Sequence, residues 1–232
     1  MRELKNTSPE GLGKSMSKHL ERDLVGLSDM ISDLGSMVVE STAKAIVMLQ
    51  NFDLVVVDEI LEAENRINDI EVEIEEECLK VMALHQPVAI DLRFIMVVLK
   101  VNNDLERMAD QIVNIANRIS FLVGQERVVV DLEFIKMGEI SSKMVRHAVD
   151  ALVNRDSTAA REVLKMDDEL DVLHARSYAV LQDLMRQKPE MVAPAVSYLT
   201  ISSNLERLGD LATNIAEEVI FMMEGEVVRH HI

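Results

Sequence analysis

The sequence is poor in aromatic residues, glycine and proline. Aromatic residues make up 3% of the chain, tryptophan is absent, and 8 glycines and 4 prolines are spread over 232 residues. Leu, Ile, Val, Met, Ala and Glu dominate instead, and these residues favour long helices over strands. A hydrophobic fraction of 48% over this length is enough to bury a substantial core. The composition therefore predicts an all-α protein.

Cysteine is almost absent, because Cys78 is the one cysteine of the chain. This excludes an internal disulfide framework and fits a reducing compartment, so we interpret Cys78 as a small core residue. The first residues lack the apolar region of a signal peptide. The longest uncharged stretch, 191–205, is shorter than the ~20 residues of a membrane span. We therefore expect a soluble, cytoplasmic protein without direct membrane insertion.

Positive charge is also scarce, since 24 Lys and Arg face 41 Asp and Glu and give a net charge of −17. Nucleic acids and anionic membranes both attract clustered Lys and Arg, so we expect neither as a partner. The chain has no glycine-rich phosphate loop and no GxSxG or HExxH signature. This composition suits a protein that binds cations or the basic surfaces of other proteins.

The sequence contains an internal duplication. The string LERMADQIVNIANRI at 105–119 returns as LERLGDLATNIAEEV at 205–219, with seven identities in fifteen positions. The repeated residues are Leu105, Glu106, Arg107, Asp110, Asn114, Ile115 and Ala116, which recur as Leu205, Glu206, Arg207, Asp210, Asn214, Ile215 and Ala216. A repeat of this kind determines the architecture and is considered before any other feature.

The apolar periodicity predicts six long antiparallel helices in two tandem, pseudo-symmetric three-helix bundles. In the first half, a seam that starts at Leu20 predicts a helix to about residue 50, and Asp53 is a plausible N-cap for the second. Pro87 fits the first turn of the third helix, and Gly124 fits its end. The predicted helices are 20–50, 53–84, 87–123, 132–154, 157–187 and 189–224. We expect a frayed N-terminus (1–19), a first repeat (20–125) and a second repeat (126–232).

The duplicated helix carries a polar stripe without Lys or Arg. In the first repeat the stripe contains Asn103, Glu106, Asp110 and Asn114, and in the second the same places are Ser203, Glu206, Asp210 and Asn214. An ordinary solvated face mixes charges, because like charges four residues apart cost a few tenths of a kcal/mol. A stripe of oxygen donors that occurs twice predicts a bound cation or a basic group of a partner.

The preceding helix of each repeat offers a matching pair. Alignment of AENRIN (63–68) with MDDELD (166–171) places Glu64 and Asn68 opposite Asp167 and Asp171. Two neighbouring helices with such pairs can surround an ion with oxygen ligands, which suit Mg, Mn, Ca or iron. His174 could add a nitrogen ligand in the second repeat, although a structural role for it is the alternative. An acidic face for protein docking is the alternative to a metal site, and the acidic run 71–77 is our prediction for a docking surface.

Two long segments resemble the signatures of the PhoU family, regulators of high-affinity phosphate uptake in bacteria. These segments are QPVAIDLRFIMVVLKVNNDLERMADQIVNI (86–115) and SSNLERLGDLATNIAEEVIF (202–221), and the resemblance extends to 62–87. It implies two three-helix bundles side by side and a cytoplasmic negative regulator rather than an enzyme. The expected partners are the ATPase subunit of the phosphate ABC transporter and the phosphate-sensing histidine kinase, and we expect a homodimer.

The resemblance also implies metal sites, because the E(D)xxxD motifs of the family are associated with multinuclear metal clusters. By position they fall on Glu106 and Asp110, and on Glu206 and Asp210. The companions on the preceding helices are Glu64, Asn68, Asp167 and Asp171. The candidate ions are divalent or trivalent: iron, zinc, manganese or magnesium. Asn68 departs from the acidic pattern, so we expect less negative charge and weaker binding in the first site.

Two other functions remain as alternatives. A ferritin-like di-metal oxidase needs Glu-x-x-His on each of two helices, whereas this chain has only Asp171-Val-Leu-His174. A purely structural helical scaffold explains the apolar seams but not the stripe that lacks basic residues in both repeats. The arginines of the LER motif, Arg107 and Arg207, could neutralise an acidic neighbour or contact a partner, and we favour the first role.

Overall fold

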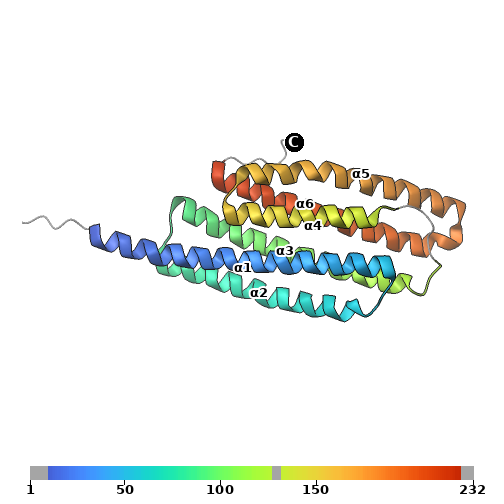
Figure 1. Ribbon diagram of the computed structural model, residues 1–232, viewed down its shortest axis with the longest axis horizontal. Coiled ribbons are helices and arrows are strands. Elements are labelled where there is room, and N and C mark those ends of the chain that lie inside the picture. The colour runs from blue at the N-terminus through green and yellow to red at the C-terminus, as the bar shows by residue number, and fades with distance from the viewer. Residues whose placement is uncertain (1–9, 127–131, 226–232) are drawn as a thin grey trace, which may run out of the picture.

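The computed structural model describes residues 10–126 and 132–225, and within these ranges the chain is helical without any strand (Figure 1). The elements are α1 (Glu10–Asn51), α2 (Val56–His85), α3 (Ala89–Leu122), α4 (Phe134–Asn154), α5 (Ser157–Gln187), the short 3₁₀ turn η1 (Pro189–Met191) and α6 (Val192–Glu224). The predicted all-α fold of six long helices is therefore confirmed. None of these helices has the length of apolar sequence that a membrane crossing requires.

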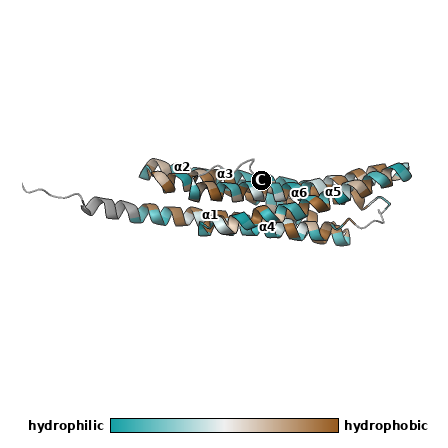
Figure 2. Ribbon diagram, turned by 90° about the horizontal axis from the view of Figure 1, so that it is seen from above, coloured by the Kyte–Doolittle hydropathy of each residue, from teal (hydrophilic) through white to brown (hydrophobic). Residues whose placement is uncertain are grey.

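The helices form two three-helix bundles that lie side by side, as predicted. Helices α1, α2 and α3 pack on one another in the first bundle, and α4, α5 and α6 do so in the second. The bundles join through α1 against α4 and through α3 against α6. Seen from above, α2, α3, α6 and α5 form one layer, and α1 and α4 lie together in a second layer (Figure 2).

One apolar core runs through both bundles. The seam predicted for the first helix is buried, since Leu27, Ile31, Leu34 and Val38 are all 0% exposed. These residues belong to the same cluster as Leu105 and the other buried positions of the second half. Cys78 lies in this core and is fully buried, which confirms its interpretation as a core residue.

The start of the first helix differs from the prediction. Helix α1 begins at Glu10, so residues 10–19 are helical and not frayed, and residues 1–9 lie outside the described part of the chain. Gly11 and Gly13 suggested a frayed segment because glycine lowers helix propensity by about 1 kcal/mol. That penalty does not end a helix that is already formed, because each residue added to the helix contributes one more backbone hydrogen bond.

Helices α2 and α3 begin a few residues later than predicted. The carboxylate of Asp53 accepts a hydrogen bond from the Val55 amide at 2.9 Å, so it closes the turn before α2 and is not the N-cap of the helix. Pro87 precedes α3, which begins at Ala89. By contrast α5 starts where predicted, because Asp156 accepts hydrogen bonds from the amides of Thr158 and Ala159.

Two glycines allow α1 and α4 to approach closely at the junction of the bundles. A Cβ atom on Gly35 would lie 2.8 Å from Val149 Cγ2, and one on Gly138 would overlap Ile46. Each helix therefore gives one glycine and receives one branched side chain from the other. This reciprocal arrangement reflects the duplication in the packing between bundles.

The α3–α6 junction contains an ion pair. Lys100 Nζ donates to Glu218 Oε2 at 2.8 Å and lies 5.8 Å from the ring centre of Phe221. Glu218 is only 3% exposed, so its carboxylate requires such a partner. The ion pair therefore links α3 of the first bundle to α6 of the second.

Candidate metal centres

The four predicted residues of the second repeat come together where α5 faces α6, and we call this group, with His174, the second cluster. Burial raises the pKa of Asp167 to about 7, and the charges of Asp171, Asp210 and Glu206 add to the effect. Burial also raises the pKa values of Glu206 and Asp210, and the charge of Asp171 contributes to both. The fold thus concentrates four carboxylates that destabilise one another's charged forms.

One oxygen of the second cluster has no hydrogen-bond partner. Asp167 Oδ1 is buried and unpaired among the residues that the structure describes. It lies against the backbone of α6 at Gly209, where an added Cβ would be 3.2 Å from this oxygen. Buried carboxylate oxygens normally have a partner, and a cation would supply one. The donor set and this unpaired oxygen therefore fit a metal ion.

The first repeat forms an equivalent group between α2 and α3. Burial raises the pKa of Glu106, and Asp110, Glu71 and Glu64 raise it further. Asn68 Nδ2 donates to Glu64 Oε1 at 2.6 Å, while Asn68 Oδ1 is buried and has no partner within the described ranges. All four predicted residues of this repeat, Glu64, Asn68, Glu106 and Asp110, thus lie in one group.

Glu71 is a member of this group that the sequence analysis assigned elsewhere. Glu71 belongs to the acidic run 71–77, for which the sequence predicts a docking surface, and in the structure Glu71 lies close enough to Glu106 to raise the pKa of that carboxyl. Glu71 follows Asn68 by three residues, as His174 follows Asp171, so extension of the repeat alignment by one helical turn would have identified it. We define the first cluster as Glu64, Asn68, Glu71, Glu106 and Asp110. Glu71 supplies a carboxylate to the first cluster and so compensates for Asn68, which has an amide where the second repeat has the carboxylate of Asp171.

The clusters are open arrangements of donors. Within residues 10–126 and 132–225, no group of three His, Cys, Asp or Glu side chains is already positioned to hold a metal ion. Mutual repulsion of carboxylates favours side-chain rotamers that keep them apart. The backbone brings donors from two helices to one face, and rotation about side-chain torsions would complete a coordination shell.

The arginines of the LER motif lie beside the clusters. Arg207 lowers the pKa values of Glu206 and Asp210, and Arg107 lowers that of Glu106, although burial and acidic neighbours outweigh both. Both arginines line a groove between α3 and α6. Their charges partly neutralise the clusters, as the sequence suggested.

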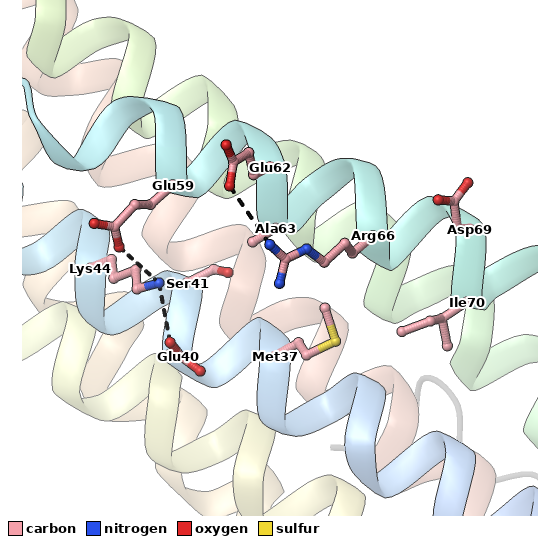
Figure 3. Close-up of a pocket in the computed structure, with 10 residues that line it drawn as sticks. All are labelled: Met37, Glu40, Ser41, Lys44, Glu59, Glu62, Ala63, Arg66, Asp69 and Ile70. Atoms are coloured by element: carbon pink, nitrogen blue, oxygen red, sulfur yellow. Dashed lines mark ion pairs between the residues drawn. The ribbon is translucent and has the colours of Figure 1, made fainter.

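A separate groove between α1 and α2 contains none of the predicted site residues (Figure 3). Lys44 lies within it and forms ion pairs of 3.1 Å with Glu40 and Glu59. Arg66 is 3.6 Å from Glu62 in the same groove. Because both cations are paired with groove carboxylates, this groove offers no concentrated charge to a ligand.

Comparison with known proteins identifies a family. The family model described as the PhoU domain matches the chain twice, at residues 31–119 and 134–219. A phosphate-specific transport system accessory protein PhoU homolog from Clostridium acetobutylicum is 32% identical, over 91% of this chain and 97% of that protein. PhoU homolog 1 from Thermotoga maritima is 31% identical, over 92% of this chain and 93% of that protein.

Solved structures agree with these matches. The crystal structure of PhoU from Pseudomonas aeruginosa has a TM-score of 0.85 and 28% identity, over 89% of this chain and 99% of that chain. That of the phosphate transport system regulatory protein PhoU from Streptococcus pneumoniae has a TM-score of 0.80 and 26% identity, over 90% and 99%. The similarity therefore spans nearly the whole of each protein.

Proposed function

Because the chain belongs to the PhoU family, we propose that it is a cytoplasmic negative regulator of phosphate uptake and of the phosphate regulon. Its relatives are named accessory proteins of a phosphate-specific transport system, and those names describe no catalysis. In this proposal the protein acts as an adaptor that binds the ATPase subunit of the phosphate transporter and the phosphate-sensing histidine kinase. It does so as a homodimer.

We further propose that the adaptor binds metal ions at the two clusters. The observation that carries this proposal is the recurrence of the carboxylate group in both repeats, with a buried, unpaired oxygen at Asp167. When bound, the ions would offset the repulsion between carboxylates. The residues that would hold them are those of the first and second clusters, and the candidate metals are those named from the sequence.

The two alternative functions, a di-metal oxidase and a purely structural scaffold, explain fewer features of the structure. A di-iron oxidase requires a Glu-x-x-His pair on two helices, and the equivalent of His174 in the first cluster is Glu71. A purely structural role does not explain the two clusters, because the repulsion between their carboxylates destabilises the fold.

The proposal is tested with a phosphate-regulon reporter in a bacterial host that lacks its own copy of the regulator, grown with ample phosphate. Wild type is compared with a variant in which Glu106, Asp110, Glu206 and Asp210 are changed to Ala. We expect wild type to silence the reporter and the variant to leave it active, with circular dichroism showing that both are folded.

A matched control removes the same charge elsewhere. The exposed residues Glu139, Glu162, Asp183 and Glu190 are changed to Ala, and this variant should silence the reporter as wild type does. Failure of wild type to silence would contradict the regulatory role in that host. Silencing by the cluster variant would instead show that the carboxylates are dispensable for regulation.

A further inference from the structure

The clusters differ at one equivalent position. His174 lies three residues after Asp171 on α5, and Glu71 lies three residues after Asn68 on α2. Each residue faces the motif carboxylates of the following helix: His174 lowers the pKa of Asp210, and Glu71 raises that of Glu106. The second cluster therefore contains an imidazole where the first has a carboxylate.

One ring nitrogen of His174 is engaged outside the carboxylates. Its Nδ1 lies 2.9 Å from Ser202 Oγ, and that hydroxyl lies 3.8 Å from Met137 Sδ. Because Nδ1 is hydrogen-bonded to the serine, Nε2 is the ring nitrogen left to ligate a metal, and a hydrogen bond of this kind orients a ligating imidazole.

The first cluster lacks this arrangement. Asn102 stands where Ser202 stands in the second repeat, and its amide donates to the backbone oxygen of Glu71 at 2.8 Å. Asn102 is 0% exposed, and its Oδ1 has no partner in the described part of the chain. The first cluster thus offers oxygen donors alone: four carboxylates and the amide oxygen of Asn68.

We infer that the two clusters prefer different ions: the second, through His174 Nε2, favours a borderline ion such as Zn²⁺, and the first favours a hard ion such as Mn²⁺. Imidazole suits zinc, whereas carboxylate and carbonyl oxygens suit manganese and magnesium. The inference rests on the proposed metal binding. It makes Ser202 a positioning residue that acts on the metal through His174.

The test measures each cluster separately in the full chain by calorimetric titration with ZnCl₂ and with MnCl₂. One protein keeps only the second cluster through Glu106→Gln and Asp110→Asn, and the other keeps only the first through Glu206→Gln and Asp210→Asn. His230 and His231 form another imidazole pair in the sequence, so both are changed to Ala throughout. Most N/O sites bind Zn²⁺ more tightly than Mn²⁺, so the quantity compared is the ratio of the two affinities.

We expect this ratio to be at least about tenfold higher in the second-cluster protein. His174→Glu should remove the difference, and Glu71→His in the first-cluster protein should raise its ratio. Ser202→Ala should weaken Zn²⁺ binding about tenfold while it leaves Mn²⁺ binding unchanged. The imidazole nitrogen resonances of His174 should shift on addition of Zn²⁺.

Two results would overturn the inference and are distinguishable. Equal ratios for the two proteins, or a ratio unaffected by His174→Glu, would refute the preference while metal binding itself stands. Absence of binding for both ions in both proteins would refute the preference together with the proposed metal binding.

Discussion

Asp167 is the residue whose surroundings most disfavour its charge. One of its oxygens is buried without a partner in the described part of the chain, and four other carboxylates lie near enough to raise its pKa. A protein retains such a residue only where the packing around it over-determines its position, here the contact with Gly209 on α6. The consequence is a fold that is less stable when the carboxylate is ionised.

This strain predicts a pH dependence of stability for the metal-free protein. The folded-state pKa of Asp167 is raised from 3.8 to about 7, so the folded state binds the proton more tightly than the unfolded state does. The free energy of unfolding should therefore fall as pH rises from about 4 to about 7, and the penalty is complete above the folded-state pKa. Because the side chain is only partly buried, solvent screening limits the effect to about 1–2 kcal/mol. Urea unfolding in EDTA across this pH range measures it.

The matching variant is Asp167→Asn, which should flatten the pH dependence and increase stability at pH 8. Asp183→Asn removes an exposed carboxylate of the same helix and should leave the pH dependence as in wild type. Equal pH dependence in wild type and Asp167→Asn would show that ionisation of Asp167 is not coupled to folding.

Among single residues, the motif carboxylates could be predicted from the sequence, because they recur in both repeats. Glu64, Asn68, Asp167 and Asp171 followed from one alignment of the repeats. Glu71 was assigned elsewhere because it lies within an acidic run that looks like a solvated face. The contact of Ser202 with His174 could not be predicted, since it joins α6 to α5 and the equivalent residue of the first repeat is Asn102.

Among the helices, α1 and α4 approach each other closely at the junction of the bundles. Gly35 and Gly138 make this approach possible, and each accommodates a branched side chain of the other helix. The two contacts are equivalent by the repeat, so the junction depends twice on the absence of a Cβ atom.

We predict that Gly138→Ala destabilises the fold, because the new Cβ overlaps Ile46. Overpacking of this kind costs about 1–3 kcal/mol, which urea unfolding detects. Ile46→Val in the same protein removes the methyl group that the Cβ meets, and should recover part of the loss in a double-mutant cycle.

Gly26 on α1 provides the control, because nothing lies within 4 Å of a Cβ added there. Gly26→Ala should stabilise the protein by about 0.5–1 kcal/mol through helix propensity alone. If both alanine variants gained stability, the close approach of α1 and α4 would not limit the packing.

The helices themselves were predictable from apolar periodicity, and their ends less so. Asp156 signalled the start of α5 correctly, because its carboxylate caps the helix. Asp53 is the same type of residue at a similar place, but its carboxylate closes a turn, and it lies three residues before Val56, the first residue of α2. The two cases differ in backbone geometry, which single residue types do not specify.

At the scale of the whole molecule, the net charge of −17 is concentrated in part at the two clusters. Self-repulsion of this size opposes the compact state. The helices that join the two bundles could not be predicted from the sequence, because an apolar seam does not specify which helix packs against it. The pairing of α1 with α4 and of α3 with α6 emerges only from the structure.

Bound cations should therefore stabilise the whole fold. Mn²⁺ at about 100 times its dissociation constant would add about 2.7 kcal/mol for one site, which corresponds to a rise in Tm of roughly 5–10 °C for a chain of this size. Differential scanning fluorimetry with and without EDTA measures the change. NaCl of equal ionic strength should have a smaller effect, and an unchanged Tm after EDTA treatment of a metal-loaded sample would contradict metal-linked stability.

The burial of Cys78 has a practical consequence for labelling experiments on this protein. The thiol is fully enclosed, and burial raises its pKa to about 12, so almost no reactive thiolate exists at neutral pH. The natural chain therefore serves as its own unreactive background for thiol labelling. A cysteine introduced at an exposed site on α2 and another on α5 would accept spin labels or fluorophores selectively, and the distance between the labels would report whether the two outer helices move when ions or partners bind.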